Sequence, residues 1–226
     1  MGKKVVAIVI FFFLLSAPLV AKAASIRRGT FLELRGGIYH PSDSDKWDTA
    51  FGRTFSAFGG LKLSQEVLKN IEVGLQVDYM HAYDRDWSVF YIPMGLSLTY
   101  AMRYKQDQLF VPYLGCGIDY VYGKTGRLKL QSDTEQSDIE PTYLQKPGYH
   151  AVAGVRFLLD ALAEEDSSSA IDQNWGVNNS YLVFEARYLK LFNSDYADQP
   201  LPANQPGTGY LDPKGILFSI GILVEF

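Results

Sequence analysis

Charged residues of both signs stand at alternate positions in segments whose remaining positions are mostly apolar. They are Glu33, Arg35, Lys62, Glu72, Asp78, Asp119, Arg156, Glu185 and Arg187. Residues two apart in an extended chain point to the same side, so we expect these charges to share one face. There they could conduct protons or ions, or neutralise one another in buried ion pairs. We favour buried ion pairs, because an unpaired charge removed from water is costly.

The three histidines, His40, His81 and His150, are the side chains best suited to acid–base catalysis or metal binding. We expect each at a strand end, solvated at one rim. The only His-x-Ser pattern joins His40 to Ser42 across Pro41, a residue suited to the end of a strand. No Gly-x-Ser-x-Gly motif is present, and the paired loop aspartates lack the rest of a calcium-binding loop. The sequence therefore predicts no catalytic residue, no metal site and no cofactor.

The elements that must position these residues are strands, because apolar residues recur with a period of two. Counting back from Phe226 in steps of two meets only large apolar residues as far as Ile216, while the intervening residues are small or mixed. The stretch from Gly215 to Phe226 has the length of a tilted transmembrane strand. Seven other segments alternate in the same way: 32–38, 55–63, 71–79, 90–100, 112–120, 150–157 and 182–188.

The expected connections alternate in length, as they do in barrels with long outer loops and short periplasmic turns. Long connections are expected at 41–52, 81–87, 123–147 and 190–213, and short ones at 66–70 and 105–108. The segment 160–179 does not fit this alternation. An even number of strands places both ends of the chain on one side. The fold predicted is an eight-stranded, antiparallel, up-and-down transmembrane β-barrel.

A soluble sandwich or a lipocalin-like barrel would also alternate, with its apolar face inward. Two features favour lipid outside. The apolar rows carry aromatic residues near strand ends, as an interfacial girdle requires, and the opposite face mixes glycine with charges. The girdle candidates are Tyr79, Phe90, Tyr100, Tyr120, Tyr188 and Phe226.

Residues 1–24 have the pattern of a secretory signal peptide, which leaves residues 25–226 as the barrel domain. Lys3 and Lys4 precede an apolar run, and Ala21-Lys22-Ala23 supplies the small residues of a cleavage site. The formal charge of −4 falls to −7 without Lys3, Lys4 and Lys22, which argues against nucleic acid as a partner. Cys116 is the only cysteine, so no disulfide can form within the chain.

The runs from Phe90 to Gly95 and from Val111 to Tyr120 resemble a pair of strands in the OmpW/OmpA-like outer-membrane β-barrel superfamily. The segments 31–43 and 184–188 and the terminal aromatic residue extend the resemblance over most of the chain. It implies a barrel in the outer membrane of a Gram-negative bacterium, surrounded by lipid and lipopolysaccharide. It also implies that the barrel-assembly machinery is a transient partner, which would read the terminal residues Val224, Glu225 and Phe226.

The leading functional hypothesis is a barrel with a plugged polar interior, which is structural or binds or passes a small apolar ligand at its outer mouth. The main alternative is a surface adhesion or host-interaction protein that acts through the loops 123–147 and 190–213. A lipid A acyl-chain enzyme is a third hypothesis, and we expect no enzymatic activity. Loop aromatics suit ligand capture and the headgroup interface equally well; they are Trp47, Trp87, Tyr122, Tyr143, Tyr196 and Tyr210.

Overall fold

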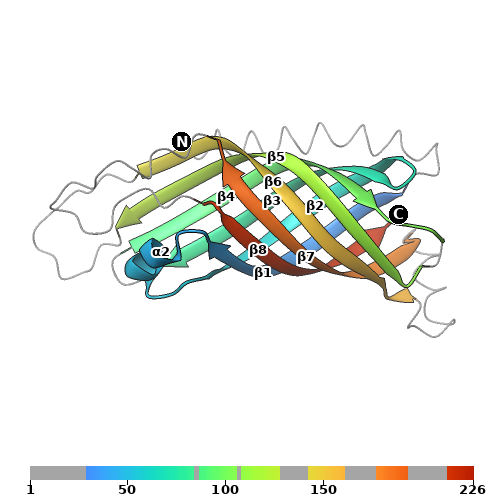
Figure 1. Cartoon of the computed structure of the whole chain (residues 1–226), viewed down its shortest axis with the longest axis horizontal. Helices are drawn as coiled ribbons and strands as arrows, with labels where there is room; N and C mark the ends of the chain where they lie inside the picture. The colour runs from blue at the N-terminus through green and yellow to red at the C-terminus, as the bar shows by residue number, and fades with distance from the viewer. Residues whose placement is uncertain (1–28, 84–86, 106–107, 128–141, 161–176, 193–212) are drawn as a thin grey trace, which may run out of the picture.

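The computed structural model describes residues 29–83, 87–105, 108–127, 142–160, 177–192 and 213–226. Each strand pairs antiparallel with the next in sequence, and β8 pairs with β1, so the sheet closes into a barrel (Figure 1). The elements are β1 (Thr30–Pro41), α2 (Ser44–Phe51), β2 (Ser56–Leu68), β3 (Ile71–Tyr83), β4 (Trp87–Ala101), β5 (Phe110–Arg127), β6 (Thr142–Leu158), β7 (Asn179–Leu191) and β8 (Gly215–Glu225). The predicted eight-stranded up-and-down barrel is confirmed.

The two ends of the barrel differ. Residues 30 and 226 are joined by two backbone hydrogen bonds, of 3.2 and 2.8 Å, at the end that also holds the β2–β3 turn. We call this the turn end, and the opposite end, which carries α2, the loop end. The β2–β3 turn is tight because Asn70 adopts a left-handed backbone conformation with φ of 67°, which asparagine tolerates better than most residues. The Glu66 carboxylate accepts a hydrogen bond of 2.8 Å from the backbone N–H of Asn70.

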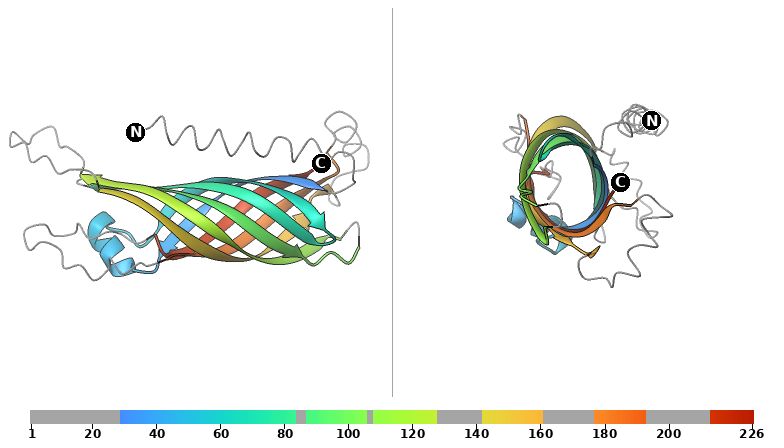
Figure 2. Two further views of the ribbon diagram at one scale, coloured as in Figure 1. Left: turned by 90° about the horizontal axis from the view of Figure 1, so that it is seen from above. Right: turned by 90° about the vertical axis from the view of Figure 1, so that its right-hand side faces the viewer.

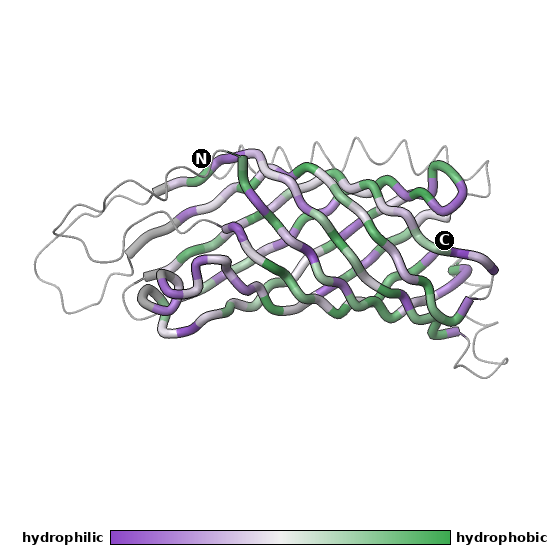
Figure 3. The backbone as a smooth tube through the Cα atoms, viewed as in Figure 1, coloured by the Kyte–Doolittle hydropathy of each residue, from purple (hydrophilic) through white to green (hydrophobic). Residues whose placement is uncertain are grey.

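The outer face of the barrel is an apolar belt. Side chains alternate along β1, so that Leu32, Leu34 and Ile38 point outward, and Leu34 is 67% exposed. Figure 3 shows the same alternation of hydrophobic and hydrophilic residues around the barrel. An exposed apolar surface of this extent has no place in water, so lipid is the solvent of the outer face. The soluble alternative fails because these large apolar side chains lie outside the barrel.

The strands β5 and β6 are longer than expected. They contain 18 and 17 residues, against 12 in β1 and 11 in β8, and they extend furthest at the loop end (Figure 2). Much of the predicted loop 123–147 is therefore strand, since β5 runs to Arg127 and β6 begins at Thr142. Tyr, Gly and Lys in this stretch still pair across the two strands although their hydropathy does not alternate clearly.

The predicted loop 41–52 contains the helix α2. No helix among the described residues is both long enough and apolar enough to cross a membrane. Residues 1–28, 161–176 and 193–212, which include the predicted signal peptide and the aromatic residues Tyr196 and Tyr210, lie outside the described residues.

Replacing Leu34 by lysine tests whether the belt faces lipid. Leu34 lies near the middle of β1, opposite Leu61 and Ile222. In a lipid-facing belt the substitution should lower the free energy of unfolding by about 2–4 kcal/mol. In a water-facing one it should change by less than about 0.5 kcal/mol. Urea titration in lipid vesicles, read by the gel mobility of folded and unfolded protein, measures the difference, and Leu34→Val is the matched control.

Candidate functional site

The interior of the barrel is built in three layers along its axis. The inward side chains of β7 show the order: Tyr181 and Val183 near the turn end are apolar or aromatic, Glu185 and Arg187 are charged, and Leu189 near the loop end is apolar again. Charged and polar residues therefore fill the middle of the barrel between two apolar clusters. All nine charged residues singled out in the sequence are buried; Glu72 and Arg156 lie beside Phe31 and Tyr113 of the turn-end cluster, and the other seven lie nearer the middle.

The centre of the polar layer is a network that crosses the lumen. Asp78 accepts hydrogen bonds from Arg35 Nε at 3.0 Å and from Arg187 at 2.5 Å. Arg35 also donates to Glu185 at 2.9 Å and to the Gln76 side chain at 3.1 Å. Since β1, β3 and β7 are not neighbours in the sheet, these contacts join opposite walls of the barrel.

A second pair lies closer to the turn end. Arg156 on β6 donates to both oxygens of Glu72 on β3, at 2.6 and 2.7 Å. The Arg156 guanidinium also lies over the ring of Tyr113, 4.9 Å from its centroid. The Tyr113 hydroxyl in turn donates to Glu185 at 2.9 Å, so it links this pair to the central network.

His150 belongs to the polar layer, and its predicted place at a solvated rim is wrong. It is 1% exposed, and its Nδ1 lies 2.6 Å from a carboxylate oxygen of Asp119. β6 begins at Thr142, so His150 stands inside the strand rather than at its start. Its even spacing from Arg156 was the available signal, because residues at even spacing in a strand share a face.

Two of the nine charged residues are not brought into close pairs. Glu33 and Lys62 are partners in the register of β1 and β2, yet neither Glu33 oxygen has a hydrogen-bond partner among the described residues. The nearest cationic nitrogen to Glu33 belongs to Arg35, at 3.9 Å. Lys62 instead donates to the Thr99 hydroxyl at 3.4 Å. The remaining seven are each held by at least one short contact.

Inward-facing glycines make room for the carboxylates. A Cβ atom at Gly60 would collide with the Asp78 carboxylate, and one at Gly95 would collide with that of Asp119. The small residues on the charged face therefore let these side chains lie along the wall of a narrow barrel.

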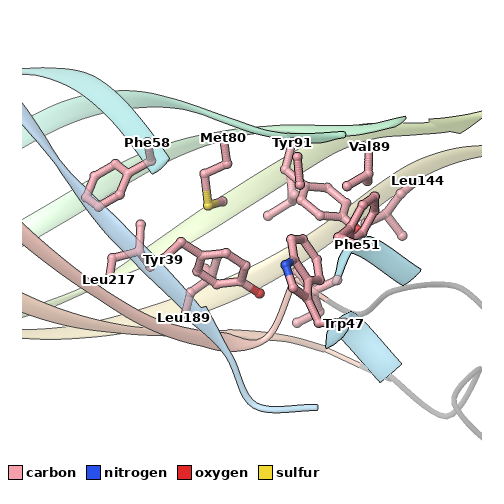
Figure 4. Close-up of a cluster of buried hydrophobic side chains, with 13 residues drawn as sticks. Tyr39, Trp47, Phe51, Phe58, Met80, Val89, Tyr91, Leu144, Leu189 and Leu217 are labelled. Carbon is pink, nitrogen blue, oxygen red and sulfur yellow. The ribbon is translucent and has the colours of Figure 1, made fainter. Parts of the chain in front are cut away.

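The loop end is closed by aromatic side chains from α2. Trp47 is 2% exposed, which corrects its prediction as an exposed loop residue. Its ring contacts Tyr39 with centroids 5.6 Å apart, Phe51 at 5.0 Å and Tyr91 at 6.5 Å. Figure 4 shows Trp47 and Phe51 directed from α2 toward the strands that line the mouth. These rings are buried because residues 44–51 form the helix α2 and not an open loop.

The other predicted site residues lie on the surface or at the turn end. His40 and His81 are exposed on the outer face, and no group of His, Cys, Asp and Glu in the described part of the chain could hold a metal ion. Val224 faces outward, and Phe226 is largely exposed beside Thr30. Glu225 turns inward and accepts hydrogen bonds from Asn179 at 3.0 Å and Tyr181 at 3.2 Å.

No protein-family model matches the sequence, and no curated protein matches it. Solved structures do match. Neisserial surface protein A superposes with a TM-score of 0.53 at 12% identity, over 88% of this chain and 97% of that one. OprG from Pseudomonas aeruginosa gives 0.51 at 14% identity, over 88% and 96%. A major outer membrane protein from Thermus thermophilus gives 0.50 at 13% identity, over 88% and 99%.

The chain has the fold of the small outer-membrane β-barrels. At these identities the likeness concerns the fold, which agrees with the resemblance seen in the sequence. The interior network and the aromatic mouth are described from this chain's own structure and are not inferred from these neighbours.

Removing one partner of the Glu72–Arg156 pair tests what the polar layer contributes. Glu72→Ala leaves the Arg156 guanidinium buried without its carboxylate and should cost about 3–5 kcal/mol of unfolding free energy. The double variant Glu72→Leu/Arg156→Met should cost markedly less, since an apolar pair can replace a buried ion pair; both variants lose the 3.1 Å contact of Glu72 with Arg103, so their difference reports on Arg156. Urea titration of both variants makes the comparison. Equal losses would contradict the pairing.

Proposed function

We propose that this chain is an outer-membrane β-barrel protein of a Gram-negative bacterium, with a closed interior, that binds a small apolar ligand at its outer mouth. The lipid-facing belt and the fold support the location. In this placement the loop end is extracellular and the turn end periplasmic, as in barrels with short periplasmic turns.

The layered interior supports a closed barrel. Arg35, Asp78 and Glu185 connect walls that are not adjacent, so the hydrogen bonds pass through the space that a pore would need. Apolar clusters lie on both sides of this layer. Ions would have to displace the ion pairs and pass the apolar cluster at the loop end, which is unfavourable at each step.

The aromatic mouth is the observation that carries the ligand proposal. Most interior surface at the loop end is apolar, including Met80, Val89, Leu144 and Leu217. This surface is covered by two rings of an eight-residue helix rather than by a strand. The Trp47 Nε1 atom is buried and has no hydrogen-bond partner among the described residues. An apolar molecule that replaced Trp47 would meet apolar walls and would free this N–H group to reach water.

Planar-bilayer recording tests the closed interior. Wild-type protein should show no steady open-channel conductance, because the polar layer and both apolar clusters obstruct the lumen. Arg35→Ala/Arg187→Ala removes the cross-lumen donors and provides the comparison. A large, steady, ion-nonselective conductance of the wild-type protein would rule the closed barrel out.

Tryptophan fluorescence tests the ligand site at the mouth. The chain has three tryptophans, so Trp87→Phe/Trp175→Phe leaves Trp47 as the sole reporter. Titration with 1-bromohexane, an apolar molecule whose bromine quenches indole emission on contact, should quench Trp47 emission with a saturable, one-site dependence. The matched control carries Trp47→Phe and Trp175→Phe and reports from Trp87. A response that rises linearly in both proteins would indicate partition into the surrounding detergent and would contradict the proposal.

Adhesion through the extracellular loops is the second candidate function. The length of β5 and β6 favours it, because these two strands extend furthest at the loop end (Figure 2). Deleting residues 128–141 should abolish binding to host cells if this hairpin is the adhesive element. Lipid A acyl-chain chemistry is less favoured, since no serine hydroxyl in the described residues donates to a histidine ring.

Two further proposals concern maturation. Residues 1–24 act as a signal peptide, so the mature chain, residues 25–226, should begin after Ala23 or Ala24, which intact mass measurement checks. The barrel-assembly machinery reads the strand that ends with Val224, Glu225 and Phe226. The exposed ring of Phe226 at the periplasmic end supports this reading.

A further inference from the structure

In the part of the chain that the structure describes, the strands carry basic side chains on their outer face at the loop end only. The described outward-facing positions of the eight strands hold no Asp or Glu, and their basic residues are His40, His81, Lys124 and Lys190. Each lies within the last four residues of β1, β3, β5 or β7, the four strands that run toward the loop end. The belt is therefore neutral over most of its height and basic at one rim.

Two of these strands, β3 and β5, and their neighbours β4 and β6 bring cations and aromatic rings together at one place on this rim. His81, Phe90, Lys124 and Tyr143 are consecutive partners in the register of β3, β4, β5 and β6. Because adjacent strands lie about 4.8 Å apart, His81 and Lys124 are separated by roughly 10 Å. We call these four residues, with Arg53 and Tyr83, the basic aromatic row.

Three rings of the row, those of His81, Tyr83 and Phe90, lie beside one another together with the neighbouring Tyr79 and Tyr122. The His81 ring lies between those of Tyr79, at 6.2 Å, and Tyr83, at 5.5 Å. Phe90 extends this group, with its ring 6.3 Å from Tyr79 and 6.0 Å from Tyr122. Tyr79, Tyr83 and Tyr143 are exposed, so this group of rings offers apolar edges and hydroxyl groups that a sugar ring can contact.

The cations of the row are held against these rings. Lys124 Nζ lies 5.8 Å from the centroid of Tyr143. The Arg53 guanidinium lies 5.4 Å from the centroid of Tyr83 and donates to the Tyr83 carbonyl at 2.6 Å. Both side chains are partly exposed at the rim, where their charges can meet an anionic group. On β4 the outward positions below Phe90 are apolar: Ile92, Met94 and Leu96.

We propose that the basic aromatic row binds a phosphorylated glycolipid of the outer leaflet, of the lipid A class. Lys124, Arg53 and His81 bind phosphate groups, as basic clusters at membrane interfaces do. The rings of Phe90, Tyr83 and Tyr143 contact the sugar rings, and the aliphatic positions below contact the acyl chains. A glycerophospholipid offers the anionic group and the chains but lacks rigid sugar rings. The inference rests on the proposed outer-membrane location and is independent of the ligand at the mouth.

Native mass spectrometry of the detergent-solubilised protein tests the proposal with three probes: bis-phosphorylated lipid A, its monophosphorylated form and phosphatidylglycerol. Wild-type protein should retain bis-phosphorylated lipid A at least about tenfold more tightly than phosphatidylglycerol. The monophosphorylated form should bind with intermediate affinity. Equal retention of bis-phosphorylated lipid A and phosphatidylglycerol would reduce the row to a general anionic interface and would overturn the proposal.

A matched pair of variants assigns the site. Arg53→Gln/Lys124→Gln should weaken lipid A binding by about tenfold or more. Lys69→Gln/Lys105→Gln removes the same charge from exposed positions at the turn end and should leave binding unchanged. Equal effects of the two double variants, or no effect of the first, would contradict the site. Gel mobility before and after boiling establishes that each variant is folded.

Hydrogen exchange of the wild-type protein supplies a measurement that needs no variant. Added lipid A should protect amides in peptides covering 79–92 and 120–127 and leave those covering 181–188 unchanged. Uniform protection of all three would contradict a localised site. The Trp47 titration reports only on the ligand site at the mouth. A variant of the row that loses lipid A binding but keeps the Trp47 response would therefore distinguish this inference from the proposed ligand function.

Discussion

The hydrogen bonds that Asp78 accepts from Arg35 and Arg187 hold the interior together. They connect β3 to β1 and to β7 across the lumen, and through Arg35 they include Glu185 and Gln76. The surrounding side chains make room for these charged groups or complete their hydrogen bonds. Glycines on the facing strands leave space for the carboxylates, and Tyr113 satisfies the second oxygen of Glu185. A barrel of this width has no water-filled lumen to solvate charges, so Arg35, Asp78, Glu185 and Arg187 depend on partners on other strands.

The apolar clusters above and below give the polar layer its low-dielectric surroundings. Phe31 and Tyr113 on one side, and Tyr39 and Leu217 on the other, keep bulk water from the ion pairs. Electrostatic attraction is stronger where water is excluded, and so is the penalty for an unmatched group. Glu33, with neither oxygen hydrogen-bonded among the described residues, is where that penalty falls most directly.

Periodicity was enough to predict the strands, their number and the face that carries the charges, because lipid outside demands apolar residues at every second position. It was not enough to predict the layers. Leu217 and Leu223 stand on the inward face of β8, where alternation alone expects polar or small residues, and only their axial position explains them. Trp47 was misjudged because an isolated aromatic residue in a connection gives no sign of folding back over the mouth. His150 and Gln76 acquire their roles from partners that are distant in sequence, Asp119 among them.

The pairing of β1 with β8, which closes the sheet, determines when some of the contacts across the lumen can form. Arg35 stands on β1 and Glu185 on β7, at opposite sides of the β1–β8 seam. In an open sheet these charges would lie far apart, and their wall would face lipid or an unfilled groove. They meet when β8 pairs with β1, so the last step of barrel formation satisfies groups from the first strand and the seventh together. Closing the barrel is therefore linked to completing the Arg35–Glu185 contact across the seam, whereas contacts between strands on one side of it, such as Arg156–Glu72 and His150–Asp119, do not depend on that step.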